Sequence, residues 1–256
     1  MKIGICTDIH SLSNCHVDYF DYVELYFTSV MDLTPNRYNE IIRNNDDMVT
    51  PIEAAIIRIP PFVRIAASNR DYDFALYYFE KCLERARGLN ISKITIGSGD
   101  ARTADLSNKH EYNMLSSFFR KIDDLCPHYQ YKVGIEAISK NMCSTLTTIK
   151  SVESFIVSSG LINTGITIDL YHMYENGDGI YEINEMNNLY HVHLCNPVNR
   201  KLPLAHDPYS YEQIFSALKR KKYIDRISIE CINDSIECTM RSSVNFLKKI
   251  LENKEH

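Results

Sequence analysis

Four short apolar runs in the second half of the chain each end in a side chain that can bind a metal ion. Their last residues are Glu136, Asp169, His193 and Glu230, at intervals of 33, 24 and 37 residues. A strand, a helix and their two loops occupy about 30 residues, and eight equal units of this 256-residue chain would contain 32 each. The spacing therefore predicts four successive strand–helix units with these side chains at the C-terminal ends of parallel strands.

Alternation within the runs indicates which face of the sheet each candidate occupies. Side chains alternate along a strand, so Glu136 shares a face with Gly134, and Asp169 shares one with Thr167 and Gly165. The other two candidates follow the same rule, and the aliphatic face is left for helices to cover. We therefore predict an α/β fold, a (β/α)8 TIM barrel, with the four side chains converging inside one rim. The small inner-face residues are interpreted as room for a substrate, with a shifted register as the alternative.

Length and composition fit one barrel domain over residues 1–256. The chain is 45% hydrophobic and has no long compositional break. A net charge of -5 and a pI near 6.0 argue against a nucleic-acid partner, because phosphate binding needs a basic surface. No run approaches the roughly 18 apolar residues that span a bilayer, and the first residues form a strand pattern, so we expect a cytoplasmic protein without a membrane partner. The eight scattered cysteines are expected to be reduced and to fill the core.

Strand and helix patterns alternate along the chain and are clearest in its second half. Strands are predicted at residues 2–7, 22–26, 62–66, 91–96, 131–136, 165–169, 190–194 and 226–230. Helices are predicted from Asp71 or Asp73 to Gly88 and at residues 107–125, 143–159, 210–221 and 235–252, the second ending before Pro127. Residues 175–188 are expected to form a loop and a short helix. Between residues 28 and 61 the sequence indicates only a helix start at Pro35 and a break at residues 60–61.

The four candidates make a mixed oxygen and nitrogen ligand set. Such a set suits Mn, Co, Mg or Zn better than copper, and the absence of a thiolate argues against a structural zinc site. A divalent ion there would polarise two neighbouring oxygens of a sugar as a Lewis acid. Glu136 and Glu230 could then act as paired bases that remove and return a proton beside the carbonyl, through an enediolate held by the metal. This is isomerase or epimerase chemistry; the alternative is that each carboxylate only caps a loop or pairs with a basic side chain.

Other polar residues lie close to these four in the sequence. His172 is expected at the rim, hydrogen-bonded to a substrate hydroxyl, with a surface-loop histidine as the alternative. Arg200 can clamp a substrate oxygen or neutralise a developing oxyanion, unless it is simply exposed. His191 faces the interior one layer below His193 and is expected to support the site without binding the metal.

Three further features give weaker signals. Glu24, in the second predicted strand, could project into the barrel. The pair His206–Asp207 could reach the site from the loop after the seventh strand. The segment Gly-Ser-Gly-Asp-Ala-Arg at residues 97–102 is similar to an anion-binding nest that would take a phosphate, with an ordinary tight turn as the alternative.

Taken in order, these motifs resemble the xylose-isomerase-like barrel superfamily, in particular its sugar phosphate isomerase and epimerase branch. The motifs are Ile135-Glu136-Ala137, Ile168-Asp169-x-x-His172, His191-Val192-His193-Leu194 with Asn199-Arg200, and Ser228-Ile229-Glu230. The resemblance covers roughly residues 71–232. It implies one divalent ion, often manganese, held by Glu136, Asp169, His193 and Glu230. It also implies that the two glutamates are the acid and base, and that His172 and Arg200 contact the substrate.

The sequence departs from the branch after Arg200. Lys-Leu-Pro-Leu-Ala-His-Asp-Pro follows, without the usual glycine-rich Pro-Gly pattern, and the loop between His193 and Arg200 is one residue longer than in the epimerases. These differences concern the loop that would close over the substrate and the position of the guanidinium group.

Several functions compete on such a site. The partner expected is a small carbohydrate, and homo-oligomerisation is left open. A dehydratase acting on a keto-inositol would use the same ion and bases, and a non-catalytic sugar-binding protein would not need both glutamates. Zinc-dependent abasic-site endonucleases of the same superfamily use extra histidines at the ends of strands three and four. Those ends, taken as residues 66–68 and 97–99, contain no histidine.

Overall fold

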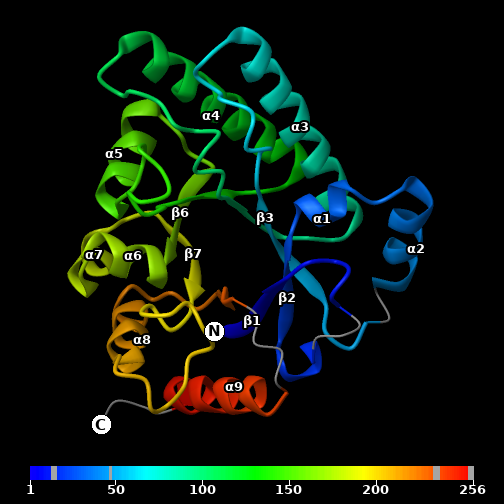
Figure 1. Cartoon of the computed structure of the whole chain (residues 1–256), viewed down its shortest axis with the longest axis vertical. Coiled ribbons are helices and arrows are strands. Elements are labelled where there is room, and N and C mark those ends of the chain that lie inside the picture. Colours follow the sequence, from blue (N-terminus) through cyan, green and yellow to red (C-terminus); the bar gives the residue numbers. More distant parts are fainter. Residues whose placement is uncertain (13–15, 46–47, 233–236, 253–256) are drawn as a thin grey trace.

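A closed barrel of eight parallel strands forms the centre of the protein (Figure 1). The structure is a computed structural model that describes residues 1–12, 16–45, 48–232 and 237–252. Each strand pairs in parallel with the next, and β1 pairs with β8 to close the ring. The strands are β1 (Lys2–Thr7), β2 (Tyr22–Tyr26), β3 (Ile52–Ile57), β4 (Lys93–Ile96), β5 (Val133–Glu136), β6 (Thr164–Asp169), β7 (Leu189–Leu194) and β8 (Arg226–Ile229). The predicted (β/α)8 TIM barrel is confirmed.

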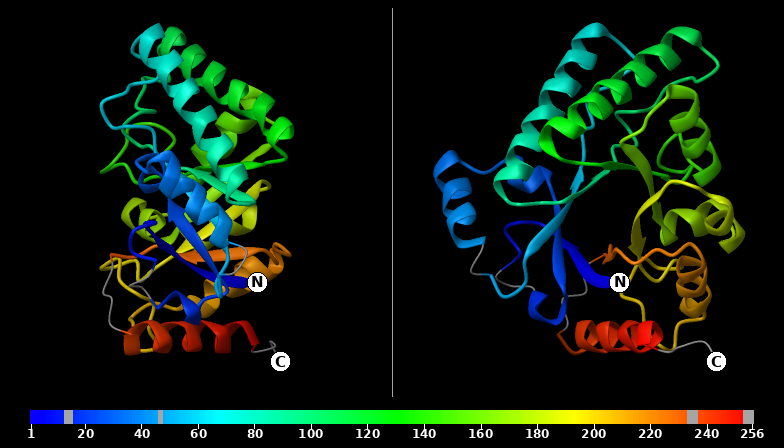
Figure 2. Two further views of the ribbon diagram at one scale, coloured as in Figure 1. Left: turned by 90° about the vertical axis from the view of Figure 1, so that its right-hand side faces the viewer. Right: turned by 180° about the vertical axis from the view of Figure 1, so that it is seen from behind.

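Helices surround the barrel and connect its strands. The two longest, α3 and α4, pack against each other along one side, and α9 covers the opposite side near the C-terminus (Figures 1 and 2). The helices are α1 (Thr28–Met31), α2 (Pro35–Asn45), α3 (Asn69–Gly88), α4 (Lys109–Tyr129), α5 (Ile149–Ser159), α6 (Leu170–Asn176), α7 (Ile180–Glu185), α8 (Tyr211–Arg220) and α9 (Glu237–Glu252), with a 3-10 turn at Val17–Tyr19. The helix predicted at residues 143–159 begins six residues later, at Ile149.

The hydrophobic core lies between the sheet and these helices. In β4, Ile94 and Ile96 belong to this core, whereas Thr95 points inward and hydrogen-bonds Thr167 across the barrel. Helix α4 supplies Phe118 to the same core, fully buried. Burying one such side chain stabilises the fold by about 1.5–3 kcal/mol, so the aliphatic outer face fixes which side chains point into the barrel.

Small residues on the inner face make room for neighbouring side chains. A Cβ atom on Gly134 would lie 2.2 Å from Thr167 Oγ1, and one on Gly165 would lie 2.6 Å from Tyr190 Cβ. Both positions are therefore filled by protein atoms. The interpretation of these residues as room for a substrate is wrong, because the barrel interior is packed at this level.

The third strand does not lie where the sequence analysis placed it. It is β3, residues 52–57, and the strand predicted at residues 62–66 is wrong. Val63 and Ile65 are buried as alternate residues of a strand would be, but Ile65 N donates to Ala101 O in a loop–loop hydrogen bond of 2.8 Å. Ala54 and Ala55 weaken the strand signal of the true segment, because alanine is depleted in strands. The residue that follows the third strand is therefore Arg58.

Two helix boundaries also differ from the prediction. Helix α3 is capped by Ser68, whose side chain accepts a hydrogen bond from Asp71 N, and not by either predicted aspartate, Asp71 or Asp73. Helix α4 does not end before Pro127 but continues two residues beyond it. A proline leaves the carbonyl four residues earlier without its helical donor.

A side chain supplies the missing donor in α4. The carbonyl concerned is that of Asp123, which accepts a hydrogen bond from Asn163 Nδ2 at 3.2 Å. The proline near the end of the helix is tolerated for this reason. Because the donor comes from a residue 40 positions away, the sequence pattern around the proline gave no sign of it.

Neither a disulfide nor a bilayer-spanning helix occurs among the described residues. Six cysteines are buried and form no disulfide, as predicted, and Cys238 is exposed. Cys15 lies outside the described residues. In the part of the chain that the structure describes, every helix is too short or too polar to cross a membrane.

Candidate metal centre

The four predicted ligands meet at the C-terminal rim of the barrel. Glu136 ends β5, Asp169 ends β6, His193 lies near the end of β7, and Glu230 directly follows β8. Each offers one ligand atom, and these four atoms all lie within 4.8 Å of one another. All four side chains are buried. The structure thus brings together side chains from four successive strands.

The imidazole of His193 lies between the carboxylates. Its Nδ1 is 3.5 Å from Glu136 Oε1 and 3.4 Å from Glu230 Oε2. Its Nε2 is 3.3 Å from Glu24 Oε1 on the other side. Donation from Nε2–H to Glu24 leaves the Nδ1 lone pair directed at the cluster, as in the carboxylate–histidine pairs that support bound metals.

Several polar atoms of the cluster lack a hydrogen bond in the described structure. They are Asp169 Oδ2, His193 Nδ1 and Glu230 Oε2. Buried polar atoms are normally hydrogen-bonded, and three buried carboxylates side by side repel one another. Burial, together with the charges of Glu230 and Glu136, raises the pKa of Asp169 well above its ordinary value. A divalent cation would satisfy the unpaired atoms and remove this repulsion, so the residues fit such an ion.

The backbone around Asp169 leaves one of its oxygens free for this purpose. Its Oδ1 caps helix α6 and accepts hydrogen bonds from Tyr171 N at 2.7 Å and His172 N at 3.4 Å. Its Oδ2 makes no hydrogen bond within the described residues. The helix that begins at this strand end therefore orients the carboxylate toward the cluster.

His172 lies beside Glu136, with its Nε2 3.9 Å from Glu136 Oε1. The side chain is buried, which excludes the alternative of a surface-loop histidine. Burial lowers the pKa of His172, which favours the neutral imidazole. Nδ1 makes no hydrogen bond within the described chain. A neutral ring with one free nitrogen can donate to or accept from a ligand hydroxyl.

Arg200 approaches the cluster from the loop after β7. Its Nη2 is 3.3 Å from Glu230 Oε1 and 3.7 Å from Asp169 Oδ2, and the guanidinium group lies over the ring of Tyr171, 4.8 Å from its centroid. The backbone of Arg200 is left-handed, with φ 55°. Despite the longer loop, its guanidinium group reaches the site.

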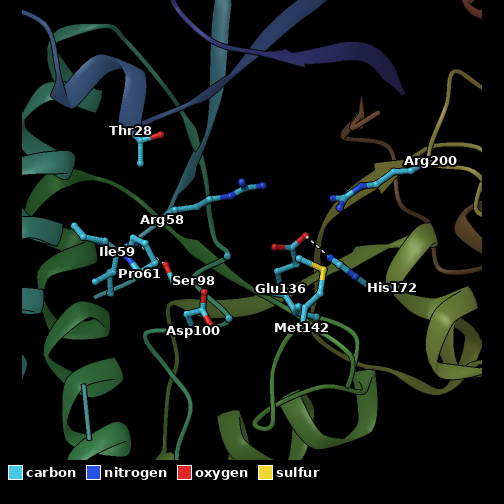
Figure 3. A pocket seen from close by; sticks show the side chains of 14 residues that line it. Thr28, Arg58, Ile59, Pro61, Ser98, Asp100, Glu136, Met142, His172 and Arg200 are labelled. Atoms are coloured by element: carbon cyan, nitrogen blue, oxygen red, sulfur yellow. Dashed lines mark hydrogen bonds and ion pairs between the residues drawn. The ribbon is translucent and has the colours of Figure 1, made fainter. Parts of the chain in front are cut away.

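A cavity of about 420 Å³ opens above the cluster (Figure 3). Glu136, His172 and Arg200 line one part of it. Loops after other strands complete the wall, with Thr28, Arg58, Ile59, Pro60, Pro61, Gly97, Ser98, Gly99, Asp100, Ile138 and Met142. This volume lies in the range of small-molecule sites. Room for a ligand therefore exists above the strands and not between the inner-face glycines.

Arg58 is the main site residue that sequence reasoning missed. It directly follows β3, lines the cavity, and its Nη2 donates to Glu230 Oε1 over 3.1 Å. The third strand was predicted at residues 62–66, so Arg58 was not recognised as the residue that follows it. The observed third and fourth strands are followed by Arg58 and Gly97, so neither strand end supplies the histidine that a nuclease would need.

Glu24 contacts the cluster from inside the barrel. It projects into the barrel, fully buried, and His191 Nε2 lies 2.8 Å from its Oε2. Burial opposes ionisation of Glu24, but His191 and His193 outweigh it and lower the pKa of Glu24. His191 thus contacts Glu24 and Ser228 and is not one of the four clustered ligands, in agreement with its predicted supporting place.

Of the remaining predicted features, the pair His206–Asp207 does not line the cavity, whereas Gly97, Ser98, Gly99 and Asp100 of the segment 97–102 do. His206 is exposed, and Asp207 accepts hydrogen bonds from Leu204 N and Tyr211 OH within its own loop. In the segment 97–102, the Arg102 guanidinium is buried and donates to the Glu136 carbonyl oxygen over 2.6 Å. That arginine supports the end of β5 and does not face the cavity.

Gly97 has a specific role beside Glu136. A Cβ atom on this residue would lie 3.1 Å from Glu136 Oε2. The absence of a side chain at the end of β4 thus leaves space for the carboxylate. This close approach explains one glycine of the segment that we considered as a phosphate-binding nest.

Comparison with known families agrees with the fold. The family described as xylose isomerase-like TIM barrel matches residues 18–250, and the chain belongs to this family. None of the curated proteins matches the sequence.

Solved structures of similar fold include several sugar epimerases. D-psicose 3-epimerase, crystallised in the presence of D-fructose, has a TM-score of 0.83 and 18% identity, covering 99% of this chain and 100% of that one. An apo 3-keto-D-glucoside 4-epimerase from E. coli has a TM-score of 0.79 and 16% identity, with 97% and 99% covered. The IolI protein with a binding zinc atom has a TM-score of 0.73 and 15% identity, with 98% and 96% covered. At these identities the likeness concerns the fold.

Proposed function

We propose that the protein is a divalent-metal-dependent isomerase or epimerase of a small keto sugar, free or phosphorylated. The observation that carries this proposal is the placement of Glu136 and Glu230. These two buried carboxylates come from strands three positions apart in the ring and flank the same nitrogen of His193, at 3.5 and 3.4 Å. Paired carboxylates beside one ligand site suit the removal of a proton by one and its return by the other.

A cation held by Glu136, Asp169, His193 and Glu230 would polarise neighbouring substrate oxygens and acidify the C–H beside the carbonyl. Manganese is the ion we expect, with cobalt, magnesium and zinc as alternatives, because the donors are carboxylate oxygens and one imidazole. Among solved structures of similar fold, the epimerases support the sugar chemistry, and the IolI protein with a binding zinc atom supports a divalent ion.

The remaining roles follow from the contacts. Glu136 accepts the substrate proton on its carboxylate and Glu230 delivers one from the other side, or the reverse. His172, with a free ring nitrogen beside Glu136, hydrogen-bonds a substrate hydroxyl. Arg200 donates to the substrate oxygen on which negative charge develops, because its guanidinium group already lies 3.3 Å from Glu230 Oε1.

Solvent hydrogen exchange tests this proposal directly. Purified protein is analysed for bound metal and then assayed in deuterated water with a panel of ketoses and ketose phosphates, with and without a chelator. We expect metal-dependent deuterium incorporation at the carbon beside the carbonyl, and its loss in Glu136→Gln and Glu230→Gln. The surface variant Glu40→Gln is the control.

The products separate the alternatives. An epimer or an aldose–ketose pair supports the proposal, whereas loss of water from a keto-inositol would replace it with dehydration. Binding of sugars without exchange in any substrate would mean that the cavity serves recognition only. Cleavage of abasic DNA would overturn the proposal in favour of a hydrolase.

A further inference from the structure

A second arginine faces the cavity and is not needed for the chemistry proposed above. Arg58 extends from the end of β3, and its guanidinium group stacks over the Tyr26 ring, 5.1 Å from the centroid. Its side chain is 49% exposed, against 18% for Arg200. Arg58 and Arg200 point toward each other from opposite sides of the cavity (Figure 3). Both guanidinium groups contact the same atom, Glu230 Oε1, at 3.1 and 3.3 Å.

Most of the hydrogen-bonding capacity of Arg58 is unused. A guanidinium group carries five N–H donors, and among the described residues Arg58 uses only Nη2, toward Glu230. The tyrosine ring fixes the plane of the group, so little side-chain freedom is lost when a ligand binds. A planar, oriented guanidinium with a free edge suits a carboxylate or phosphate, which accepts two parallel hydrogen bonds.

The described surroundings of Arg58 contain no other carboxylate that could occupy it. Asp100 also lines the cavity, but its carboxylate lies 3.9 Å from Arg64 Nη2. Glu136 lies 3.5 Å from His193 Nδ1 and 3.9 Å from His172 Nε2 and makes no ion pair with Arg58 in the described structure. The wall beyond Arg58 consists of Thr28, Ile59, Pro60 and Pro61, which offer one hydroxyl and no negative charge. A second negative group, on the free edge of Arg58, would therefore have to come from the ligand.

We propose, on the basis of the function proposed above, that the substrate is an anionic sugar whose phosphate or carboxylate binds Arg58. The reacting carbons lie over Glu136 and Glu230, and the anionic group lies at the end of the molecule nearest β3. Arg200, the more buried of the two, acts on the reacting carbons, and the free, more exposed edge of Arg58 takes the anionic group. These two roles explain why the cavity contains two arginines, because a neutral sugar would need only Arg200.

Equilibrium binding of unreactive open-chain ligands tests the inference apart from catalysis. Sorbitol, sorbitol 6-phosphate and gluconate share a six-carbon chain and differ in charge, and none has an aldehyde or ketone group that would acidify a neighbouring C–H. Affinities are measured by titration calorimetry on the manganese-loaded protein, on Arg58→Met and Arg58→Lys, and on Arg37→Met as the control. Arg37 lies on α2 and pairs with Glu40. Thermal unfolding checks that each variant is folded.

We expect the wild-type protein to bind one anionic ligand at least about tenfold more tightly than sorbitol, the factor that a charge-assisted hydrogen bond provides. Arg58→Met should abolish this preference and leave sorbitol affinity within about twofold, whereas Arg58→Lys should keep part of it. The tighter of the two anions identifies phosphate or carboxylate as the group. Arg37→Met should behave as wild type.

Two results would overturn the inference. One is equal affinity of the wild-type protein for sorbitol and both anions. The other is an Arg58→Met variant that loses sorbitol and the anions by the same factor, which would mean that Arg58 acts only through Glu230. If the anion preference is found but no ketose or ketose phosphate exchanges hydrogen, the anion site stands and the isomerase proposal fails. If neutral ketoses exchange hydrogen and no anion preference is found, the isomerase proposal stands and the anion site fails.

Discussion

The two ends of the barrel both carry clusters of charged side chains, but only at one end does every acid have a basic partner within hydrogen-bond distance. At the N-terminal end, Lys93 from β4 crosses to Asp225, just before β8, with a 2.6 Å ion pair. Glu53 accepts from Lys2 at 2.7 Å and from Arg226 at 2.6 Å. Arg226 also contacts Asp225 at 2.9 Å. Each of these acids has basic partners within hydrogen-bond distance, so this end holds strands β1, β3, β4 and β8 together.

The C-terminal end has the opposite balance. Three carboxylates surround one imidazole, and Asp169 Oδ2, His193 Nδ1 and Glu230 Oε2 have no hydrogen bond in the described chain. Two arginines that follow strands β3 and β7, Arg58 and Arg200, contact these carboxylates at 3.1 to 3.7 Å. Such an arrangement lowers stability without a ligand. The comparison indicates that one end is built for the fold and the other for a bound ion and its substrate.

Neutralising one glutamate at the C-terminal end should give the largest effect of all. We predict that Glu136→Gln or Glu230→Gln lowers the rate of hydrogen exchange about 10²–10⁴-fold, the contribution of a positioned acid or base. The free energy of unfolding should change little, because a like-charge neighbour is removed along with one partner. Exchange rates and urea unfolding of the same preparations measure both quantities.

Glu53→Gln is the matched control at the other end of the barrel. It also removes one carboxylate charge, but from a pair of satisfied ion pairs. We expect its exchange rate to stay within about threefold of wild type and its stability to fall. Comparable activity losses in both variants would break the distinction between the two ends.

Removing the counter-charge of Lys93 should have the next largest effect. Asp225→Asn leaves the buried Lys93 ammonium without its ion-pair partner, and burial already lowers the pKa of Lys93. We predict a loss of about 3 kcal/mol in the free energy of unfolding, the lower limit for breaking a buried pair, because Asp225 is partly exposed. The surface variant Glu84→Gln, which breaks an exposed pair with Lys81, should leave the free energy of unfolding nearly unchanged.

The convergence of the four candidate ligands could be predicted from the sequence because each of them ends an apolar run at regular spacing. Glu136 and Asp169 are strand residues whose neighbours alternate clearly, and closure of the sheet then makes them converge. Arg58 was not predicted as a site residue because β3 contains two alanines and was predicted ten residues too late. The pairing of Glu24 with His193 joins β2 to β7 across the interior, and no local pattern reports such a contact.

Glu24 lies inside the barrel between its two ends, and its replacement should have an intermediate effect. Its carboxylate accepts from both His191 and His193, whereas a glutamine amide can accept from only one of them and directs N–H groups at the other. The His193 tautomer that leaves Nδ1 free is then no longer enforced. We predict that Glu24→Gln weakens manganese binding about 10- to 100-fold, as loss of a histidine-supporting carboxylate does.

Ser228→Ala provides the control for Glu24. Ser228 Oγ lies 3.2 Å from His191 Nε2 and 2.6 Å from Tyr22 OH, so its removal disturbs the same layer at His191 and leaves the Glu24–His193 contact in place. Titration calorimetry with Mn²⁺ should give an affinity within about threefold of wild type for this variant. Equal losses in both variants would mean that general packing, and not the Glu24–His193 contact, sets the metal affinity.

Asp169→Asn should give the smallest effect, and the sign of its change in the free energy of unfolding is informative. Asp169→Asn keeps the oxygen that caps α6, because asparagine is as good an N-cap as aspartate, but it removes one of three clustered charges. In chelator-treated protein we predict that the free energy of unfolding stays equal or rises by about 1 kcal/mol. Addition of Mn²⁺ at about 100 times its dissociation constant should stabilise the wild-type protein by about 2.7 kcal/mol and leave the variant unchanged.

Asp123→Asn gives the opposite sign in the same experiment. Asp123 is also buried, but its carboxylate accepts hydrogen bonds from Ile162 N, Asn163 N and Thr164 Oγ1. Replacing it should lower stability by about 1–3 kcal/mol, because a satisfied buried acceptor becomes partly unsatisfied. If Asp169→Asn lost stability in the same way, with or without Mn²⁺, the carboxylate of Asp169 would be stabilising the fold directly. The cluster would then not be a metal centre.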